Sequence, residues 1–223
     1  LTLVGFGLRA FHLNAQSLWY DEIASVTVAT TPFADLVRAV ETGGRVEPTA
    51  WISTAYYALL KSVLWWPHTA PDGILRLSSV VLGTAAIPAI AWTAIAFLPG
   101  DAVLATTAAL AISPFHVWYS QEVRPYVLLV LIGTLLMGAY LRALENNRAP
   151  WWCAVTLLMT VALYTHPIAL AFPVICGVGV LAAAASSPRR SLPGVAALVA
   201  TGLAFLPAVL WMSAHGANHP ADP

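Results

Sequence analysis

The stretch LRLSSVVLGTAAIPAIAWTAIAFL at residues 75–98 decides the fold class, because it contains one charged residue, Arg76. About 20 apolar residues in a helix cross the ~30 Å hydrocarbon core of a bilayer. Six other apolar runs lack the two-residue alternation of a membrane barrel. They fall at about 1–13, 102–118, 125–141, 151–164, 167–185 and 192–212. The sequence therefore predicts an all-α polytopic membrane protein with about seven transmembrane helices.

The composition supports this class and excludes others. Of 223 residues, 59% are hydrophobic and only 9% are charged, whereas a soluble domain carries about a quarter of charged residues. Ten basic residues balance ten acidic ones, so there is no basic surplus for a nucleic-acid partner. Cys153 and Cys176 both lie in apolar runs, which indicates no disulfide framework.

The first run, 1–13, is too short to cross a bilayer alone. We interpret it as the outer part of a helix that begins upstream. A signal peptide is the alternative, but the run has no basic start and no small-residue cleavage site. We therefore expect residues 1–223 to form a single transmembrane domain, the N-terminal portion of a longer protein, with a first outer loop at 14–74.

The segment TAWISTAYYALLKSVLWW at 49–66 has two interpretations. Lys61 and the aromatic residues at both ends favour an interfacial helix on the membrane surface. If the segment instead crosses the membrane as an ordinary span, every later loop moves to the opposite side of the membrane. If the segment does not cross, the four arginines of two later loops share one side, which should be the cytoplasm. These are Arg142, Arg148, Arg189 and Arg190.

This topology places four polar motifs on the outer face: SLWYDE at 17–22, RVEP at 45–48, HVWYSQEVRPY at 116–126 and YTHP at 164–167. Asp21 and Glu22 directly follow the first span, where ionised groups are costly and often functional. Simple solvation of two acids at a helix exit is the alternative.

Glu122 and Arg124 stand between two apolar spans. They could form a structural ion pair, or Arg124 could bind phosphate with its planar fork while Glu122 binds a metal or hydroxyl. His166 in its turn is more typical of a cap than of a ligand. Lys61 and Arg76 could be residues that reach toward lipid headgroups. Phosphate-loop, dinucleotide, serine-hydrolase and H-E-x-x-H motifs are absent from the sequence.

Five motifs in this order resemble the polytopic glycosyltransferases of the GT-C superfamily. The closest likeness is to the family 39-like branch related to protein O-mannosyltransferases and aminoarabinose transferases. The motifs are LWYDE at 18–22, EP…YYALLK at 47–61, RLSSVVLG at 76–83, SPFHVWYSQEVRPY at 113–126 and LYTH at 163–166.

The resemblance implies that Asp21 is a catalytic base and Glu122 a second catalytic carboxylate. It implies a polyprenyl-phosphate sugar donor, an active site outside the plasma membrane, and a lipid, glycan or protein acceptor. The chain departs from the family pattern at one point, since many relatives read HPPL where this chain reads Glu47-Pro48-Thr49-Ala50. Beside these two catalytic carboxylates, the expected substrate-binding residues are Tyr20, Glu22, Glu47, Lys61, Arg76, Arg124, Tyr126 and His166.

The chemistry suits these residues. A lipid-phosphate leaving group departs as an anion, so one carboxylate base and a positive charge suffice. A single displacement would invert the anomeric carbon. A divalent metal shared by Asp21 and Glu122 is compatible with this scheme but is not required. The alternatives are a transporter or lipid flippase, which would place charges near the bilayer midplane, and a non-catalytic subunit of a cell-envelope assembly.

Overall fold

The computed structural model describes residues 1–32, 34–36, 53–63 and 71–215, and every regular element in these ranges is helical. The prediction of an all-α fold is confirmed. The helices are α1 (Thr2–Ala10), α2 (Tyr20–Thr30), α4 (Thr54–Val63), α5 (Asp72–Ala94), α6 (Gly100–Ile112), α7 (Pro114–Tyr119), α8 (Tyr126–Asn146), α9 (Ala149–Leu163), the 3₁₀ helix η2 (Pro167–Leu170), α10 (Ala171–Ser186) and α11 (Pro188–His215).

Four helical segments are long and apolar enough to cross a membrane: α5, α8, η2 with α10, and α11. They are consistent with an integral membrane protein. The apolar helices α6 and α9 have only 13 and 15 residues, which rise about 20 Å and 22 Å. Both fall short of a ~30 Å hydrocarbon core. The expected count of about seven spans is therefore not confirmed.

The predicted run 102–118 is divided between two helices. α6 ends at Ile112 and α7 begins at Pro114, with Ser113 between them. The Ser113 hydroxyl accepts a hydrogen bond from the His116 N–H at 3.4 Å. Proline has no backbone N–H and a fixed φ, so it suits the first position of a new helix. This break separates the apolar helix from the polar segment that follows it.

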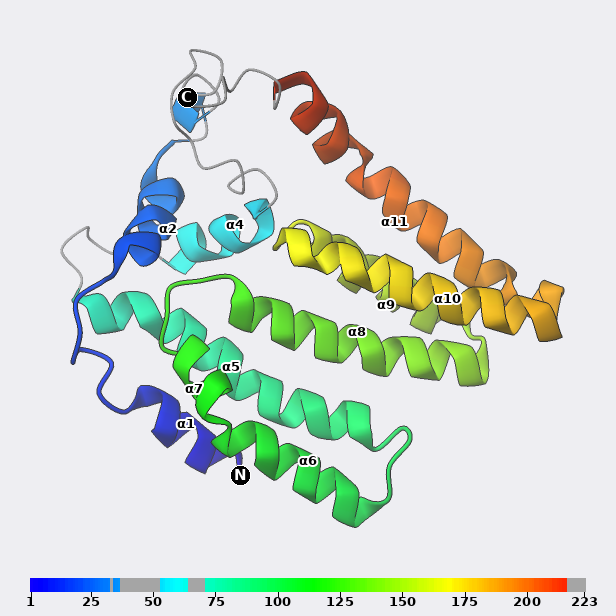
Figure 1. The fold of residues 1–223 in the computed structure, drawn as a ribbon, viewed down its shortest axis with the longest axis horizontal. Coiled ribbons are helices and arrows are strands. Elements are labelled where there is room, and N and C mark those ends of the chain that lie inside the picture. The colour runs from blue at the N-terminus through cyan, green and yellow to red at the C-terminus, as the bar shows by residue number, and fades with distance from the viewer. Residues whose placement is uncertain (33, 37–52, 64–70, 216–223) are drawn as a thin grey trace, which may run out of the picture.

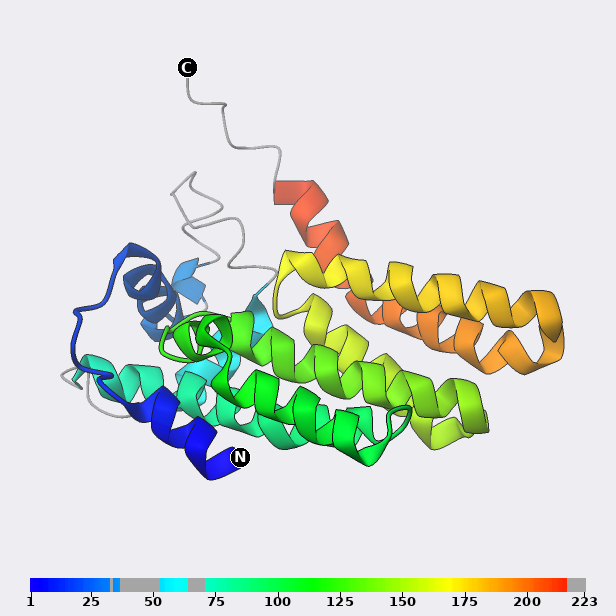
Figure 2. The same ribbon diagram turned by 60° about the horizontal axis from the view of Figure 1, so that its bottom comes forward.

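The long helices pack side by side. α5 contacts α1, α6 and α8, α8 contacts α9, and α11 contacts both α9 and α10. Figures 1 and 2 show α2, α4 and α7 gathered at one end, with the turns α5–α6, α8–α9 and α10–α11 at the other. We call the first the loop end (residues 11–30, 53–63 and 113–126, with the start of α5) and the second the turn end (residues 95–101, 142–152 and 183–191).

The described part of the ambiguous segment 49–66 is α4, a helix of ten residues. Its length of about 15 Å cannot cross a bilayer. Tyr56, Tyr57 and Leu60 are buried in a cluster with Ala29 of α2 and Val123. α4 therefore packs within the loop end. A position at the membrane surface stays a prediction.

Candidate functional site

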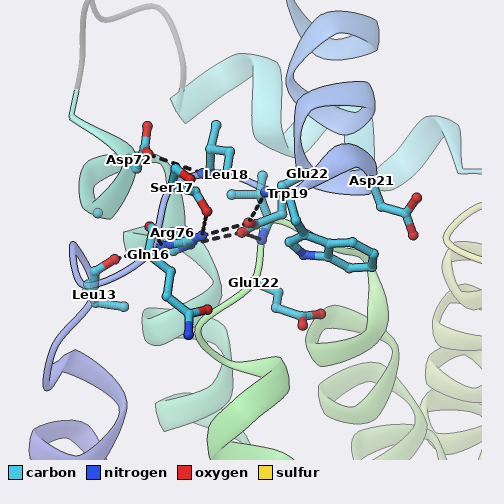
Figure 3. Close-up of polar contacts among 12 residues, drawn as sticks. Leu13, Gln16, Ser17, Leu18, Trp19, Asp21, Glu22, Asp72, Arg76 and Glu122 are labelled. Carbon is cyan, nitrogen blue, oxygen red and sulfur yellow. Dashed lines mark hydrogen bonds and ion pairs between the residues drawn. The ribbon is translucent and has the colours of Figure 1, made fainter.

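A buried ion pair organises the loop end. The Arg76 guanidinium on α5 donates from Nε to Glu22 Oε1 at 2.9 Å and from Nη2 to Glu22 Oε2 at 2.7 Å (Figure 3). Its Nη1 donates to the carbonyls of Leu13 and Gln16, and Nη2 also reaches that of Ser17. These bonds use all five N–H groups of an arginine. Arg76 therefore fastens the loop after α1 and has no donor left for a ligand.

Glu22 also joins two motifs that lie far apart in the sequence. Its Oε1 accepts a hydrogen bond from the Val123 N–H at 2.9 Å, and its Oε2 accepts one from the Trp19 N–H. Burial alone would raise the pKa of Glu22, but the bonds from Arg76, Val123 and Trp19 lower it below its usual value. The ionised carboxylate thus holds the motif at 17–22 against the motif at 116–126.

The Asp21 side chain points away from that of Glu22 (Figure 3). Its Oδ2 lies 3.5 Å from Nη2 of Arg124, and Nη1 of Arg124 donates to the Asp21 carbonyl at 3.3 Å. The guanidinium also lies 5.5 Å from the Tyr126 ring centre. Among the described residues, the buried Nε of Arg124 has no partner. In contrast to Arg76, Arg124 is held by long contacts and keeps donors for a ligand.

Glu122 carries the second carboxylate of this region. The Trp118 indole N–H donates to its Oε1 at 2.7 Å, while its Oε2 is buried without a partner in the described part of the chain. Burial raises the pKa of Glu122, and the Trp118 hydrogen bond opposes that rise. This oxygen is therefore available to a hydroxyl group or a metal ion.

A cavity of about 560 Å³ opens at the loop end between these groups. Glu122, Glu22 and Arg76 contribute to its walls together with four aromatic residues, Trp19, Trp118, Tyr119 and Tyr126. Its volume lies in the range of small-molecule sites, which combine apolar and aromatic walls with a few polar groups. Asp21 and Arg124 are not among its lining residues, so their pair lies beside the cavity.

The other expected site residues are more dispersed. Tyr20 is 82% exposed, and Lys61 is exposed on α4. His166 accepts the Ile168 N–H on its Nδ1 at 3.2 Å and caps η2, with its ring centre 5.3 Å from that of Tyr126. Burial, and to a lesser degree Arg124, lowers the pKa of His166. Glu47 lies outside the described residues.

Arg9 is a residue that the sequence reasoning missed. It is fully buried, and its guanidinium donates to the Ser120 hydroxyl and the Ala111 carbonyl and lies 2.7 Å from Nδ1 of His116. These bonds fasten α1 to the end of α6 and to the segment before Glu122. A single arginine within an apolar run is the signal, because its charge is costly there unless its donors are satisfied.

The described residues include no group of three or more His, Cys, Asp or Glu side chains that could hold a metal ion. A metal shared by Asp21 and Glu122 would need further ligands from substrate, from water or from residues outside the described ranges.

Comparison with known proteins gives no match: no protein-family model, no curated protein and no solved structure is similar to this chain at a significant level.

Proposed function

We propose that this chain forms the membrane region of a glycosyltransferase. It transfers a sugar from a polyprenyl-phosphate donor to an acceptor hydroxyl, with inversion. The observation that carries the proposal is the loop-end cavity, where Glu122 stands among four aromatic residues with one carboxylate oxygen free of partners in the described chain. Aromatic walls with a few directed polar groups are suited to an amphipathic ligand such as a sugar. A lipid, glycan or protein could supply the acceptor hydroxyl.

Arg124 is the proposed phosphate ligand. All the donors of Arg76 are occupied, whereas Arg124 Nε has no partner among the residues that the structure describes. Its Nη2 lies 3.5 Å from the Asp21 carboxylate and 3.5 Å from the Tyr126 hydroxyl. Such long contacts cost little to exchange for charge-assisted hydrogen bonds to phosphate. Binding of the donor phosphate would draw Arg124 from Asp21 and leave that carboxylate unpaired.

Asp21 is the proposed general base, as the resemblance implies, and Glu122 the carboxylate that holds a hydroxyl in the cavity. The acceptor must lose one proton as it attacks, and an unpaired carboxylate beside the cavity can take it. The phosphate leaves as an anion that Arg124 stabilises. A divalent metal at the two carboxylates would stabilise the same leaving group.

The proposal includes a topology. The loop end faces the outside of the plasma membrane and the turn end faces the cytoplasm, because the latter carries Arg142, Arg148, Arg189 and Arg190. About seven spans result if α1, α6 with α7, and α9 also cross, with local thinning of the bilayer around the shorter helices.

Cysteine labelling tests this topology. In a background without Cys153 and Cys176, a cysteine at Ala15 should react with an impermeant maleimide added outside intact cells. A cysteine at Arg189, at the turn end, should react only after permeabilisation, because the two positions lie at opposite ends of the helices. Labelling of both from the same side would contradict the topology.

Release of polyprenyl phosphate tests the activity itself. Full-length protein in detergent is incubated with a panel of short-chain polyprenyl-phosphate sugars and a membrane-lipid acceptor extract. We expect acceptor-dependent release of polyprenyl phosphate for one sugar, with the product anomer inverted by nuclear magnetic resonance. Release with retained configuration would exclude the single displacement. Absence of release for every sugar of the panel with this extract would count against the enzyme.

The pH profile should respond to Trp118. Its N–H stabilises the charged form of Glu122, so Trp118→Phe should raise the pKa of Glu122 further. If ionised Glu122 holds a substrate hydroxyl, the acidic limb of kcat/KM against pH moves to higher pH. Trp151→Phe, at the turn end, serves as control and should leave the limb in place. An unmoved limb in Trp118→Phe would remove Glu122 from this role.

A further inference from the structure

A second cavity, of about 180 Å³, lies at the turn end between α8, α9, α10 and α11. Its polar lining comes from Asn147 and from four residues at the α10–α11 turn, Ser186, Ser187, Arg190 and Ser191. The rest of the wall is apolar. The proposed sugar transfer takes place at the opposite end of the helices and makes no use of this cavity.

Arg190 is the charged residue that lines this cavity in the described part of the chain. Within the described ranges its guanidinium makes one hydrogen bond, from Nη2 to the Glu145 carbonyl at 3.3 Å. The Asn147 side-chain oxygen already accepts the Trp152 indole N–H at 2.9 Å. The remaining donors of Arg190 form a planar fork, whose geometry matches the oxygens of a phosphate group.

The surrounding charge favours an anion. In the described chain the turn end holds four arginines, Arg142, Arg148, Arg189 and Arg190, against two acids, Asp101 and Glu145. Arg142 is committed to the protein, because its guanidinium lies 3.9 Å from the Trp92 ring centre and donates to the Trp92 carbonyl. Arg148 does not line the cavity. The positive charge that a ligand in the cavity can contact directly therefore comes from Arg190, at the α10–α11 turn.

The helices beside the cavity offer an apolar surface. In each of the segments 167–186 and 188–214, only 17% of an apolar stretch of 18 residues is buried. Exposed side chains on these helices include Val178, Leu181 and Leu192. A lipid whose headgroup enters the cavity can therefore lay its acyl chains along α10 and α11. Basic pockets between membrane helices commonly bind anionic headgroups in this way.

We infer that the turn-end cavity binds the phosphate of an anionic phospholipid, such as phosphatidylglycerol. Arg190 donates hydrogen bonds to the phosphate oxygens, and the hydroxyls of Ser186 and Ser187 lie within the same cavity to add further donors. The acyl chains remain in the bilayer against α10 and α11. This site is independent of the proposed sugar transfer.

Native mass spectrometry of the full-length, delipidated protein tests the site. Dioleoyl-phosphatidylglycerol should bind more tightly than dioleoyl-phosphatidylcholine. Arg190→Gln should weaken phosphatidylglycerol binding roughly tenfold, the effect of about one charge-assisted hydrogen bond. Arg148→Gln is the matched control, because Arg148 is exposed at the same end but does not line the cavity. It should change binding less than about twofold.

A second measurement uses the unaltered protein, in case Arg190→Gln does not fold. A photoactivatable phosphatidylglycerol should label the peptide that contains residues 183–191 more strongly than its phosphatidylcholine analogue. Equal labelling by both lipids, or equal losses in Arg190→Gln and Arg148→Gln, would overturn the inference. Thermal stabilisation by inorganic phosphate as strong as that by phosphatidylglycerol would replace the lipid with a free anion.

Discussion

Arg76→Ala should lower the free energy of unfolding by about 3–5 kcal/mol, the usual effect of removing one partner of a buried ion pair. The substitution leaves the Glu22 carboxylate buried with no countercharge, and it releases the carbonyls of Leu13, Gln16 and Ser17. The loop after α1 then loses these three bonds to α5 and keeps the hydrogen bonds of the Leu18 N–H to Asp72 and of the Gly73 N–H to Asn14. The measurement is the midpoint of thermal unfolding in detergent, with unfolding monitored by tryptophan fluorescence.

Arg148→Ala is the control for this prediction, since Arg148 is exposed at the turn end. It should shift stability by no more than about 0.5 kcal/mol. Replacing both partners together, as Glu22→Gln with Arg76→Met, should recover part of the loss because no buried charge remains. If Arg76→Ala were as stable as Arg148→Ala, the buried pair could not be the attachment of the loop end.

Acid should weaken the same attachment. The pKa of Glu22 is lowered in the folded protein from its ordinary value of 4.5. Its contribution to stability is therefore fully present above about pH 4.5 and is lost as the pH falls through the lowered folded pKa. Across this pH range, the midpoint of thermal unfolding should depend less on pH in Glu22→Gln than in the wild-type protein.

The sequence predicted the helices well where length and hydrophobicity alone determine them. The break at Ser113 and Pro114 was overlooked although its signal is local, because a serine before a proline favours the start of a new helix. The shortness of α9 was visible in the sequence. The apolar run 151–164 has 14 residues and α9 has 15, and both fall short of the roughly 20 residues that cross a bilayer.

The site was predictable only in part, for a geometric reason. Asp21 and Glu22 have the same chemistry and adjacent positions, but consecutive side chains on a helix point about 100° apart. That rotation sends Glu22 into a buried pair with Arg76 and turns Asp21 toward Arg124. Similarly, Arg76 was expected either to reach lipid headgroups or to bind substrate, and its donors are instead occupied within the protein. The carbonyls that occupy it lie about 60 residues earlier in the chain, at a distance that local patterns do not encode.

Asp21→Asn is expected to reduce kcat about 10²–10⁴-fold, because the amide cannot accept the proton of the acceptor hydroxyl. Glu122→Gln should raise KM about tenfold and lower kcat by less, since it weakens a hydrogen bond to a bound hydroxyl. Both variants should remain folded, as neither carboxylate belongs to the buried pair of Glu22 and Arg76. Their thermal midpoints check this point.

The most direct test of the central claim compares the turnover of a polyprenyl-phosphate sugar by full-length Asp21→Asn and Asp101→Asn. Asp101 is an exposed acid in the first turn of α6, at the opposite end of the helices. The loop-end site predicts near-complete loss of single-turnover transfer in Asp21→Asn and a rate within about twofold of wild type in Asp101→Asn. Full transfer by Asp21→Asn, or equal losses in both variants, would contradict it.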